Sequence, residues 1–167
     1  EGLTQVSQES PKPGPGQVVV GVRAVSLNYR DLMVAAGHYP GALDRPLVPC
    51  SDGAGEVLAV GAGVTRVKPG DRVAASFFPD WHGGDPSMAK IAASLGGSAD
   101  GMLAEQVLLS EQALVHIPEH LDFVEAACLP CAGVTAWNAM FETGDLKPGD
   151  TVLLQGTGGV SVWALQM

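Results

Sequence analysis

The sequence is poor in aromatic and basic residues. Aromatic side chains make up 5% of its 167 residues, and 9 lysine and arginine residues stand against 18 aspartate and glutamate residues. The formal net charge of -9 would repel a phosphate backbone and an anionic membrane surface rather than attract them. Nucleic acid and membrane are therefore excluded as the expected partners.

Long apolar runs and cysteine are also scarce. The longest apolar stretch, residues 126–141, contains Pro130 and Gly133 and stays below the roughly 18 residues of a membrane helix. Three cysteines with no secretory leader before them favour a reducing compartment, so we expect a cytoplasmic protein. The chain also lacks an initiator Met and stops within a helical pattern, from which we expect a fragment of a longer protein.

The patterns that are present change character along the chain. Alternating apolar residues predict short strands over 18–27, 56–60, 72–75, 103–109 and 114–117, with short helices over 29–36 and 88–95. Helical spacing follows from Leu121 to Phe141, and then a strand over 151–155, a glycine loop and the start of a helix. This order predicts a β-rich domain over 1–121 and the truncated start of an α/β domain over 122–167.

The glycine loop after residue 154 is the most specific single motif. It reads Gln155-Gly156-Thr157-Gly158-Gly159-Val160-Ser161 and lies between the predicted strand and the predicted helix. A dinucleotide site needs this arrangement, because glycines let a pyrophosphate approach the backbone and helix N-terminal amides face the phosphates. Ser161 replaces the usual third glycine, and a glycine-rich turn without a ligand is the alternative.

Seven short motifs resemble the medium-chain dehydrogenase/reductase superfamily, in that family's order and over nearly the whole chain. They are Ser26-Leu27-Asn28-Tyr29-Arg30-Asp31, Gly37-His38-Tyr39-Pro40, Ser51-Asp52-Gly53-Ala54-Gly55-Glu56-Val57, Gly61-Ala62-Gly63-Val64, Lys68-Pro69-Gly70-Asp71-Arg72-Val73, Ala132-Gly133-Val134-Thr135-Ala136 and Gly156-Thr157-Gly158-Gly159-Val160. Within the superfamily the chain is most similar to zinc-independent alcohol-dehydrogenase-like and quinone-oxidoreductase-like members. The resemblance implies a GroES-like β-barrel domain, a Rossmann NAD(P)-binding domain and a cleft between them.

The same resemblance argues against zinc. Zinc-using relatives place a cysteine near the start of the short helix, where this chain has Tyr29, Arg30 and Asp31. They place a histidine ahead of the Gly-Ala-Gly segment, where Ser51 and Asp52 stand here, and Cys131 falls at a third ligand position. One thiolate does not make a tetrahedral site, so we expect no metal; a stray site using Cys50, Asp52 and His38 is the alternative.

Cys128 and Cys131 have the C-x-x-C spacing of a redox pair. A helical pattern runs into Cys128, whereas redox chemistry needs a helix that starts there, so we expect these cysteines to pack in the core.

Without zinc, the substrate must be polarised by hydrogen-bond donors. The resemblance implies that Asn28 and Thr135 lie by the nicotinamide and its ribose, and that Tyr29 and Tyr39 face the substrate. The predicted catalytic residues are thus Asn28, Tyr29 and Tyr39. The predicted cofactor-binding residues are Asn28, Thr135, Gly156, Thr157, Gly158, Gly159, Val160 and Ser161. As alternatives, Asn28 could cap the following helix, Thr135 could pack between helices, and the tyrosines could belong to the core.

The expected function is a zinc-independent, NAD(P)-dependent oxidoreductase. It would transfer a hydride between the cofactor, NADP favoured over NAD, and an alcohol or carbonyl, a quinone or an activated alkene. The expected partners are a small-molecule substrate and, in the full-length protein, a second copy in a homodimer. An enoyl-reductase module of a larger synthase and a non-catalytic binding or scaffold domain remain as alternatives.

Overall fold

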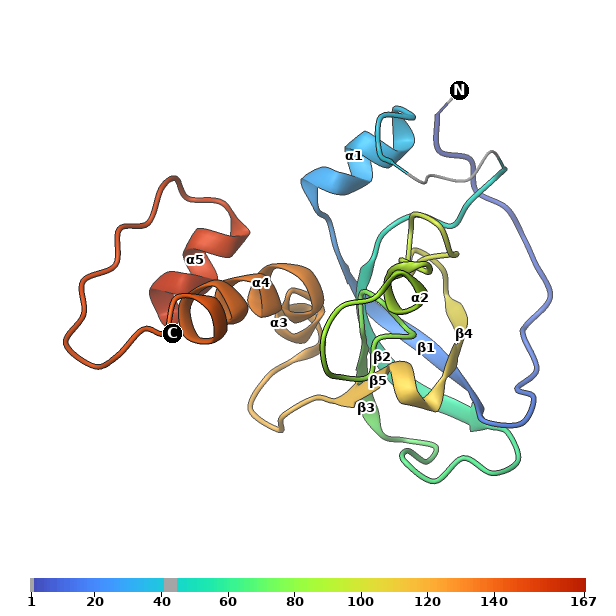
Figure 1. Cartoon of the computed structure of the whole chain (residues 1–167). Coiled ribbons are helices and arrows are strands. Elements are labelled where there is room, and N and C mark those ends of the chain that lie inside the picture. Colours follow the sequence, from blue (N-terminus) through green and yellow to red (C-terminus); the bar gives the residue numbers. More distant parts are fainter. Residues whose placement is uncertain (1, 41–44) are drawn as a thin grey trace.

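The architecture is an antiparallel sheet followed by a helical segment. In the computed structural model, which describes residues 2–40 and 45–167, five strands form one sheet in the order β4-β1-β2-β3-β5 (Figure 1). The strands are β1 (Gln17–Ser26), β2 (Asp52–Val60), β3 (Arg72–Ala75), β4 (Gln106–Ser110) and β5 (Leu114–His116). All four strand pairings are antiparallel, and β1 pairs with both β2 and β4.

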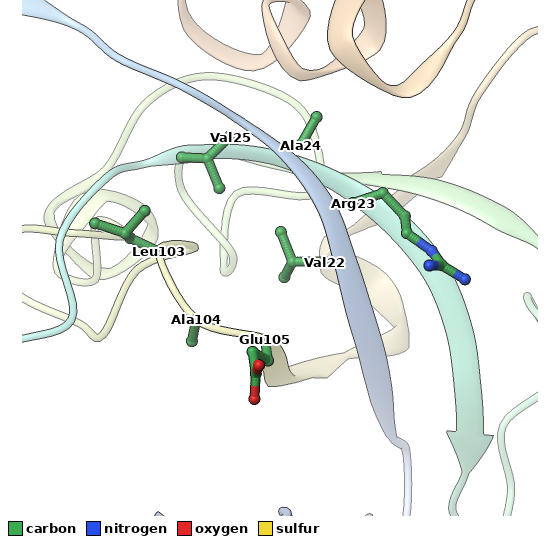
Figure 2. A pocket seen from close by; sticks show the side chains of 7 residues that line it. All are labelled: Val22, Arg23, Ala24, Val25, Leu103, Ala104 and Glu105. Atoms are coloured by element: carbon green, nitrogen blue, oxygen red, sulfur yellow. The ribbon is translucent and has the colours of Figure 1, made fainter. Parts of the chain in front are cut away.

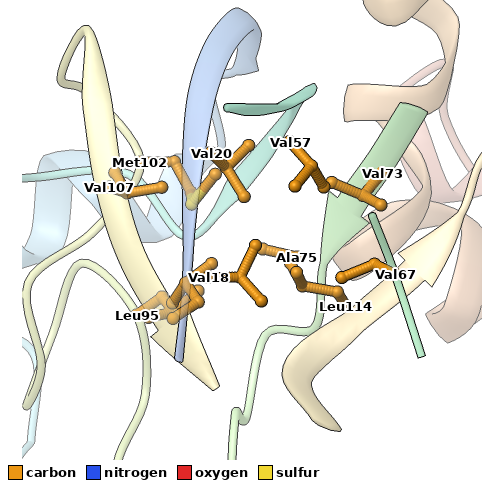
Figure 3. Packing of buried hydrophobic residues seen from close by; sticks show 11 residues of the cluster. Val18, Val20, Val57, Val67, Val73, Ala75, Leu95, Met102, Val107 and Leu114 are labelled. Carbon is orange, nitrogen blue, oxygen red and sulfur yellow. The ribbon is translucent and has the colours of Figure 1, made fainter. Parts of the chain in front are cut away.

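The main core lies against one face of this sheet. Val18 and Val20 are two residues apart on β1 and are almost fully buried, as period two requires for neighbours on one face of a strand. Figure 3 shows them beside Val57 of β2, with Leu95 and Met102 from the connecting segment completing the cluster. Each fully buried valine or leucine contributes about 1.5–3 kcal/mol to folding, so this cluster stabilises the sheet.

Helices occupy the connections and the C-terminal part of the chain. The connections hold α1 (Tyr29–Ala35), α2 (Met88–Ile91) and the 3₁₀ turn η1 (Glu111–Ala113). The C-terminal part holds α3 (Phe123–Ala127), η2 (Leu129–Gly133), α4 (Val134–Trp137), η3 (Asn138–Thr143) and α5 (Gly159–Gln166). The two helices predicted between residues 121 and 141 thus form one winding stretch, in which η2 and η3 are wide π-helical turns.

The helical stretch is attached to the sheet through α3. Ala126 and Ala127 of α3 are buried against Ala54, Ala74 and Ile117, in a second cluster on the sheet. The side chains there are small, so α3 approaches the strands closely. The predicted domain boundary at residues 121/122 therefore lies just before a helix that packs on the sheet, and it stays a prediction.

Four predicted elements differ from the structure by three residues or more, and one of them is the strand predicted over 103–109, which begins at Gln106 as β4. The strand predicted over 151–155 is wrong: these residues form no strand, because no other described segment lies beside them to complete hydrogen bonds, and Figure 1 shows a loop. The helix predicted over 88–95 ends at Ile91. Strand β2 begins four residues earlier than predicted, at Asp52, through Gly53 and Gly55.

None of the helices formed by the described residues combines the length and the apolarity that crossing a bilayer requires.

Candidate active site

Asp52, the first residue of β2, is the centre of a buried polar group. It is fully buried, and its carboxylate accepts hydrogen bonds from Ser51 Oγ at 2.6 Å and from the backbone N–H of Cys131 at 3.0 Å. Burial raises the pKa of Asp52, while the hydrogen bonds from Ser51 and Cys131 and the nearby Asn28 amide oppose that rise. The two distant segments that carry β2 and η2 are therefore joined by one carboxylate.

Asn28 lies next to this carboxylate and precedes α1. Its backbone N–H donates to Asp31 Oδ2 at 2.8 Å, so Asp31 caps the start of the helix. The Asn28 Nδ2 atom is buried and has no hydrogen-bond partner among the described residues. An amide donor that is buried without a partner is costly, so Asn28 carries a donor available to a bound oxygen.

The two predicted tyrosines have different surroundings. Tyr29 is the first residue of α1 and is 78% exposed, so it is not a core residue. Tyr39 is partly buried, and its ring lies on the guanidinium of Arg30. Arginine side chains are mostly exposed in proteins, whereas Arg30 is buried here. No pattern of residues 28–31 distinguishes the two outcomes, because the groups that cover Arg30 come from residues 77 and 94–95.

Cys50 and Cys131 lie in surroundings that disfavour the thiolate. Burial, followed by the charges of Asp31 and Asp52, raises the pKa of the Cys50 thiol to about 11. Burial and Asp52 also raise the pKa of Cys131. All three cysteines are free, and Cys128 lies between the end of α3 and the start of η2. Within residues 2–40 and 45–167, no group of three or more His, Cys, Asp or Glu side chains is placed to hold a metal ion.

The glycine loop occupies the turn before α5. Gly156 has a φ of +78°, a left-handed conformation that favours glycine, and no atom lies within 4 Å of the position of an added Cβ. Gly158 precedes the helix without a capping side chain, so first-turn amides remain accessible. Ser161, which replaces the usual third glycine, links the two ends of the loop, because its Oγ donates a hydrogen bond to the Gln155 carbonyl at 2.9 Å.

The turn η2 lies between the buried carboxylate and the glycine loop. Its Cys131 donates to Asp52, and its Ala132 lies 3.4 Å from the position of a Cβ on Gly159. Thr135 follows on α4 and is exposed. The structure thus joins the region of Asn28 and Asp52 to the glycine loop through η2. Tyr29 is the first residue of α1, and Tyr39 contacts Arg30 of the same helix. The assigned roles of all these residues remain predictions.

An open groove lies elsewhere on the sheet. Figure 2 shows it between Val22–Val25 of β1 and Leu103–Glu105 of the segment that enters β4. None of the site residues predicted from the sequence lines it.

Residues 14–119 match the family model described as the alcohol dehydrogenase GroES-like domain. The chain belongs to this family. The resemblance to the medium-chain dehydrogenase/reductase superfamily is confirmed, and so is the GroES-like fold class, with the exception of the strand over 151–155.

Relatives of this alcohol dehydrogenase family member include dehydrogenases and quinone oxidoreductases. A zinc-type alcohol dehydrogenase-like protein of Schizosaccharomyces pombe is 47% identical over 157 residues, which are 93% of this chain and 45% of that protein. A crystal structure of an NAD-dependent alcohol dehydrogenase is 35% identical with a TM-score of 0.84, covering 96% of this chain and 49% of that one. For the quinone oxidoreductase of Pseudomonas syringae these values are 34%, 0.74, 96% and 43%. The chain therefore spans about half the length of the relatives it matches.

Proposed function

We propose that the protein is a zinc-independent, NAD(P)-dependent oxidoreductase. Its substrate would be an alcohol or carbonyl, a quinone or an activated alkene, as the names of its relatives suggest. The observation that carries the proposal is the position of η2, which contacts the Asp52 carboxylate on one side and the start of α5 on the other. The region of Asn28 and Asp52, where the substrate would be polarised, and the loop that would bind the phosphates are thereby joined through the same short turn.

The donor set around Asp52 supports chemistry without zinc. Zinc sites use thiolates, imidazoles and carboxylates, whereas the groups near Asp52 are the Asn28 amide, the Ser51 hydroxyl, the Asp31 carboxylate and the thiols of Cys50 and Cys131, whose raised pKa values disfavour the thiolate. Among the described residues no three such groups are placed to hold one metal ion. Both carboxylate oxygens of Asp52 already accept hydrogen bonds, from Ser51 and from Cys131. These residues do not fit a tetrahedral zinc, although the fission-yeast relative is named a zinc-type protein.

The glycine loop fits a dinucleotide. Around Gly156 and Gly158 an added Cβ would meet no atom within 4 Å, so the backbone is open to a pyrophosphate. Unpaired amides at the start of the eight-residue α5 would donate to its oxygens. Gly156, Thr157, Gly158, Gly159, Val160 and Ser161 would hold the phosphates, and Thr135 the ribose. When bound, the nicotinamide supplies or accepts the hydride.

The chain's own residues would supply polarisation and orientation. The Asn28 Nδ2–H group would donate to an oxygen of the substrate or of the nicotinamide, which satisfies the donor left unpaired in the structure. The Tyr39 and Tyr29 hydroxyls would lie toward the substrate, where a hydroxyl can donate a proton to the carbonyl oxygen while the hydride adds to the carbonyl carbon. Asp52 would hold Ser51 and η2 in place beneath the site.

The test is binding and turnover of the dihydronicotinamide by the protein. We expect a saturable change of NADPH fluorescence, a weaker one with NADH, and oxidation of NADPH by an aldehyde, quinone or enone. Asn28→Ala should lower kcat by about 10²–10³-fold, the usual effect of losing one oxyanion donor. Metal analysis should find substoichiometric zinc.

Two controls accompany this test. Gly158→Asp should weaken nucleotide binding, because a carboxylate would face the phosphates, whereas Gln112→Glu adds the same charge on exposed η1 and should not. Absence of any nucleotide response would contradict the proposed function, and a stoichiometric zinc ion would contradict its zinc-independent form. Cytoplasmic location and a homodimer, to be measured by fractionation and light scattering, are part of the same proposal.

A further inference from the structure

Arg30 joins three segments that are distant in the sequence. It belongs to α1 and is 9% exposed. Its Nη1 donates to the Leu95 carbonyl at 2.7 Å, and its Nη2 donates to Ser94 Oγ at 3.0 Å. The Tyr39 ring centroid lies 4.7 Å from its Cζ and that of Phe77 lies 4.6 Å away. The guanidinium therefore links α1, the segment around Tyr39 and the 77–97 segment.

This arrangement requires arginine rather than any cation. The planar guanidinium directs two nitrogens to two acceptors while its faces lie against aromatic rings, and an ammonium group cannot do both. The nearest carboxylate oxygen, Asp31 Oδ1, is 4.0 Å from Nη1, so the charge is offset in part by the rings. The fit is tight, because a Cβ added to Gly97 would lie 2.2 Å from Nη2.

Arg30 is connected to two of the predicted site residues, Asn28 and Tyr39. Asp31, the next residue, caps α1 by accepting from the Asn28 N–H, and Tyr39 lies on the guanidinium itself. A shift of Arg30 would therefore move the Tyr39 ring and the start of α1 relative to the 77–97 segment. We propose that Arg30 is a positioning residue, which fixes Tyr39 and Asn28 in the geometry that the reaction requires. The role in turnover rests on the proposed function.

Fluorine NMR tests the geometry without any activity. The chain has two tyrosines, so protein labelled with 3-fluorotyrosine should give two resonances: one from exposed Tyr29 and one from Tyr39 beside Arg30. Arg30→Lys keeps the positive charge but loses the planar contact. We expect it to shift the Tyr39 resonance and to leave the Tyr29 resonance in place. Arg45→Lys, at an arginine on the surface paired with Asp100, is the matched control.

Kinetics test the consequence for the reaction. Arg30→Lys should lower kcat by about 10²-fold, since misplacing a reacting group by about 1 Å has an effect of that size. KM for NADPH should change little, because the contacts of Arg30 are made to residues 39, 77 and 94–95 and not to the glycine loop. If Arg30→Lys fails to fold, Gly97→Ala is the second variant: it keeps Arg30 and displaces Nη2, and it should shift the same resonance.

The outcomes separate the inference from the proposed function. An unmoved Tyr39 resonance in both variants overturns the positioning role, and so does a moved resonance with unchanged kcat. A shift of the Tyr39 resonance together with the loss of kcat at constant KM supports it. If the unsubstituted protein does not oxidise NADPH, the proposed function and the role in turnover both fail, while the fluorine spectra still decide whether Arg30 holds Tyr39.

Discussion

Asp52 illustrates how a single residue acquires its properties from distant segments. The side chain is fully buried, and burial raises the pKa of its carboxyl above the ordinary value of 3.8. The folded state therefore keeps the proton more tightly than the unfolded state does. The stabilising contribution of the protonated carboxyl is present at low pH, and it is lost as the pH rises from the ordinary value through the raised folded value.

Asp52→Asn should remove this pH dependence. The amide resembles the neutral acid: its oxygen can accept from the Cys131 N–H, and its nitrogen can donate to Ser51 Oγ. We expect the melting temperature of the unsubstituted protein to fall with rising pH over that interval, and the Asp52→Asn curve to be flatter there. Asp100→Asn, whose side chain is 55% exposed, should follow the unsubstituted protein. Parallel curves for all three proteins would contradict the prediction.

The site residues could be predicted only in part. Asn28 and Tyr39 were predicted as site residues because they lie in short motifs that resemble a known family. The burial of Arg30 and Asp52 could not be found from sequence, since charged residues are mostly exposed unless distant partners cover them. Those partners, Leu95 and the Cys131 N–H, are 65 and 79 residues away along the chain.

Elements follow local rules where the required neighbours are close in sequence. The turn Lys68–Asp71 has Pro and Gly at its central positions, which favour a type II turn, and Gly70 has the positive φ, +91°, that this turn needs. The same four residue types recur at Lys147–Asp150, with Gly149 at +97°. The first turn leads into β3, whereas the second leads into a segment with no strand, so turn chemistry alone does not make a strand.

Asp71 should contribute stability that is lost in acid. Its carboxylate accepts from the Lys68 side chain and backbone and from His116, and these contacts lower its pKa to about 2. The contribution is present above pH 3.8, the ordinary pKa of an aspartate, and is lost as the pH falls toward 2. Asp71→Asn should lower the melting temperature at pH 7 and weaken its acid dependence.

The second turn supplies the control for this prediction. Asp150 accepts from the Lys147 backbone at 2.8 Å in an exposed position without a following strand, so Asp150→Asn should change the melting temperature less. Equal effects of the two substitutions in thermal unfolding would contradict the assignment of Asp71.

At the scale of the whole molecule, stability depends on the main hydrophobic cluster, in which Leu95 and Met102 pack against the valines of the sheet. Met102 is 1% exposed, and it fills the space that Gly53 leaves open, since a Cβ there would lie 2.7 Å from Met102 Cβ. Glycine and aspartate at the start of β2 are poor strand formers, which is why the sequence predicted a shorter strand. Their place in the sheet is set by this packing.

Met102→Ala should therefore destabilise the protein by about 2–5 kcal/mol, the range for truncating a large core side chain. Met88→Ala, at a methionine 80% exposed, should change the free energy of unfolding by less than about 0.5 kcal/mol. Chemical denaturation of the two variants measures both values. Similar costs for the two methionines would show that Met102 is not part of the core.

The sequence by itself determined the order of most elements, the position of the turns and the glycine loop, because these depend on residues within a few positions of one another. Only the tertiary structure decided that Arg30 and Asp52 are buried and that η2 joins Asp52 to the glycine loop. It also decided that residues 151–155 form no strand. Each of these depends on a group far away in the chain, whose presence or absence beside a segment no local pattern records.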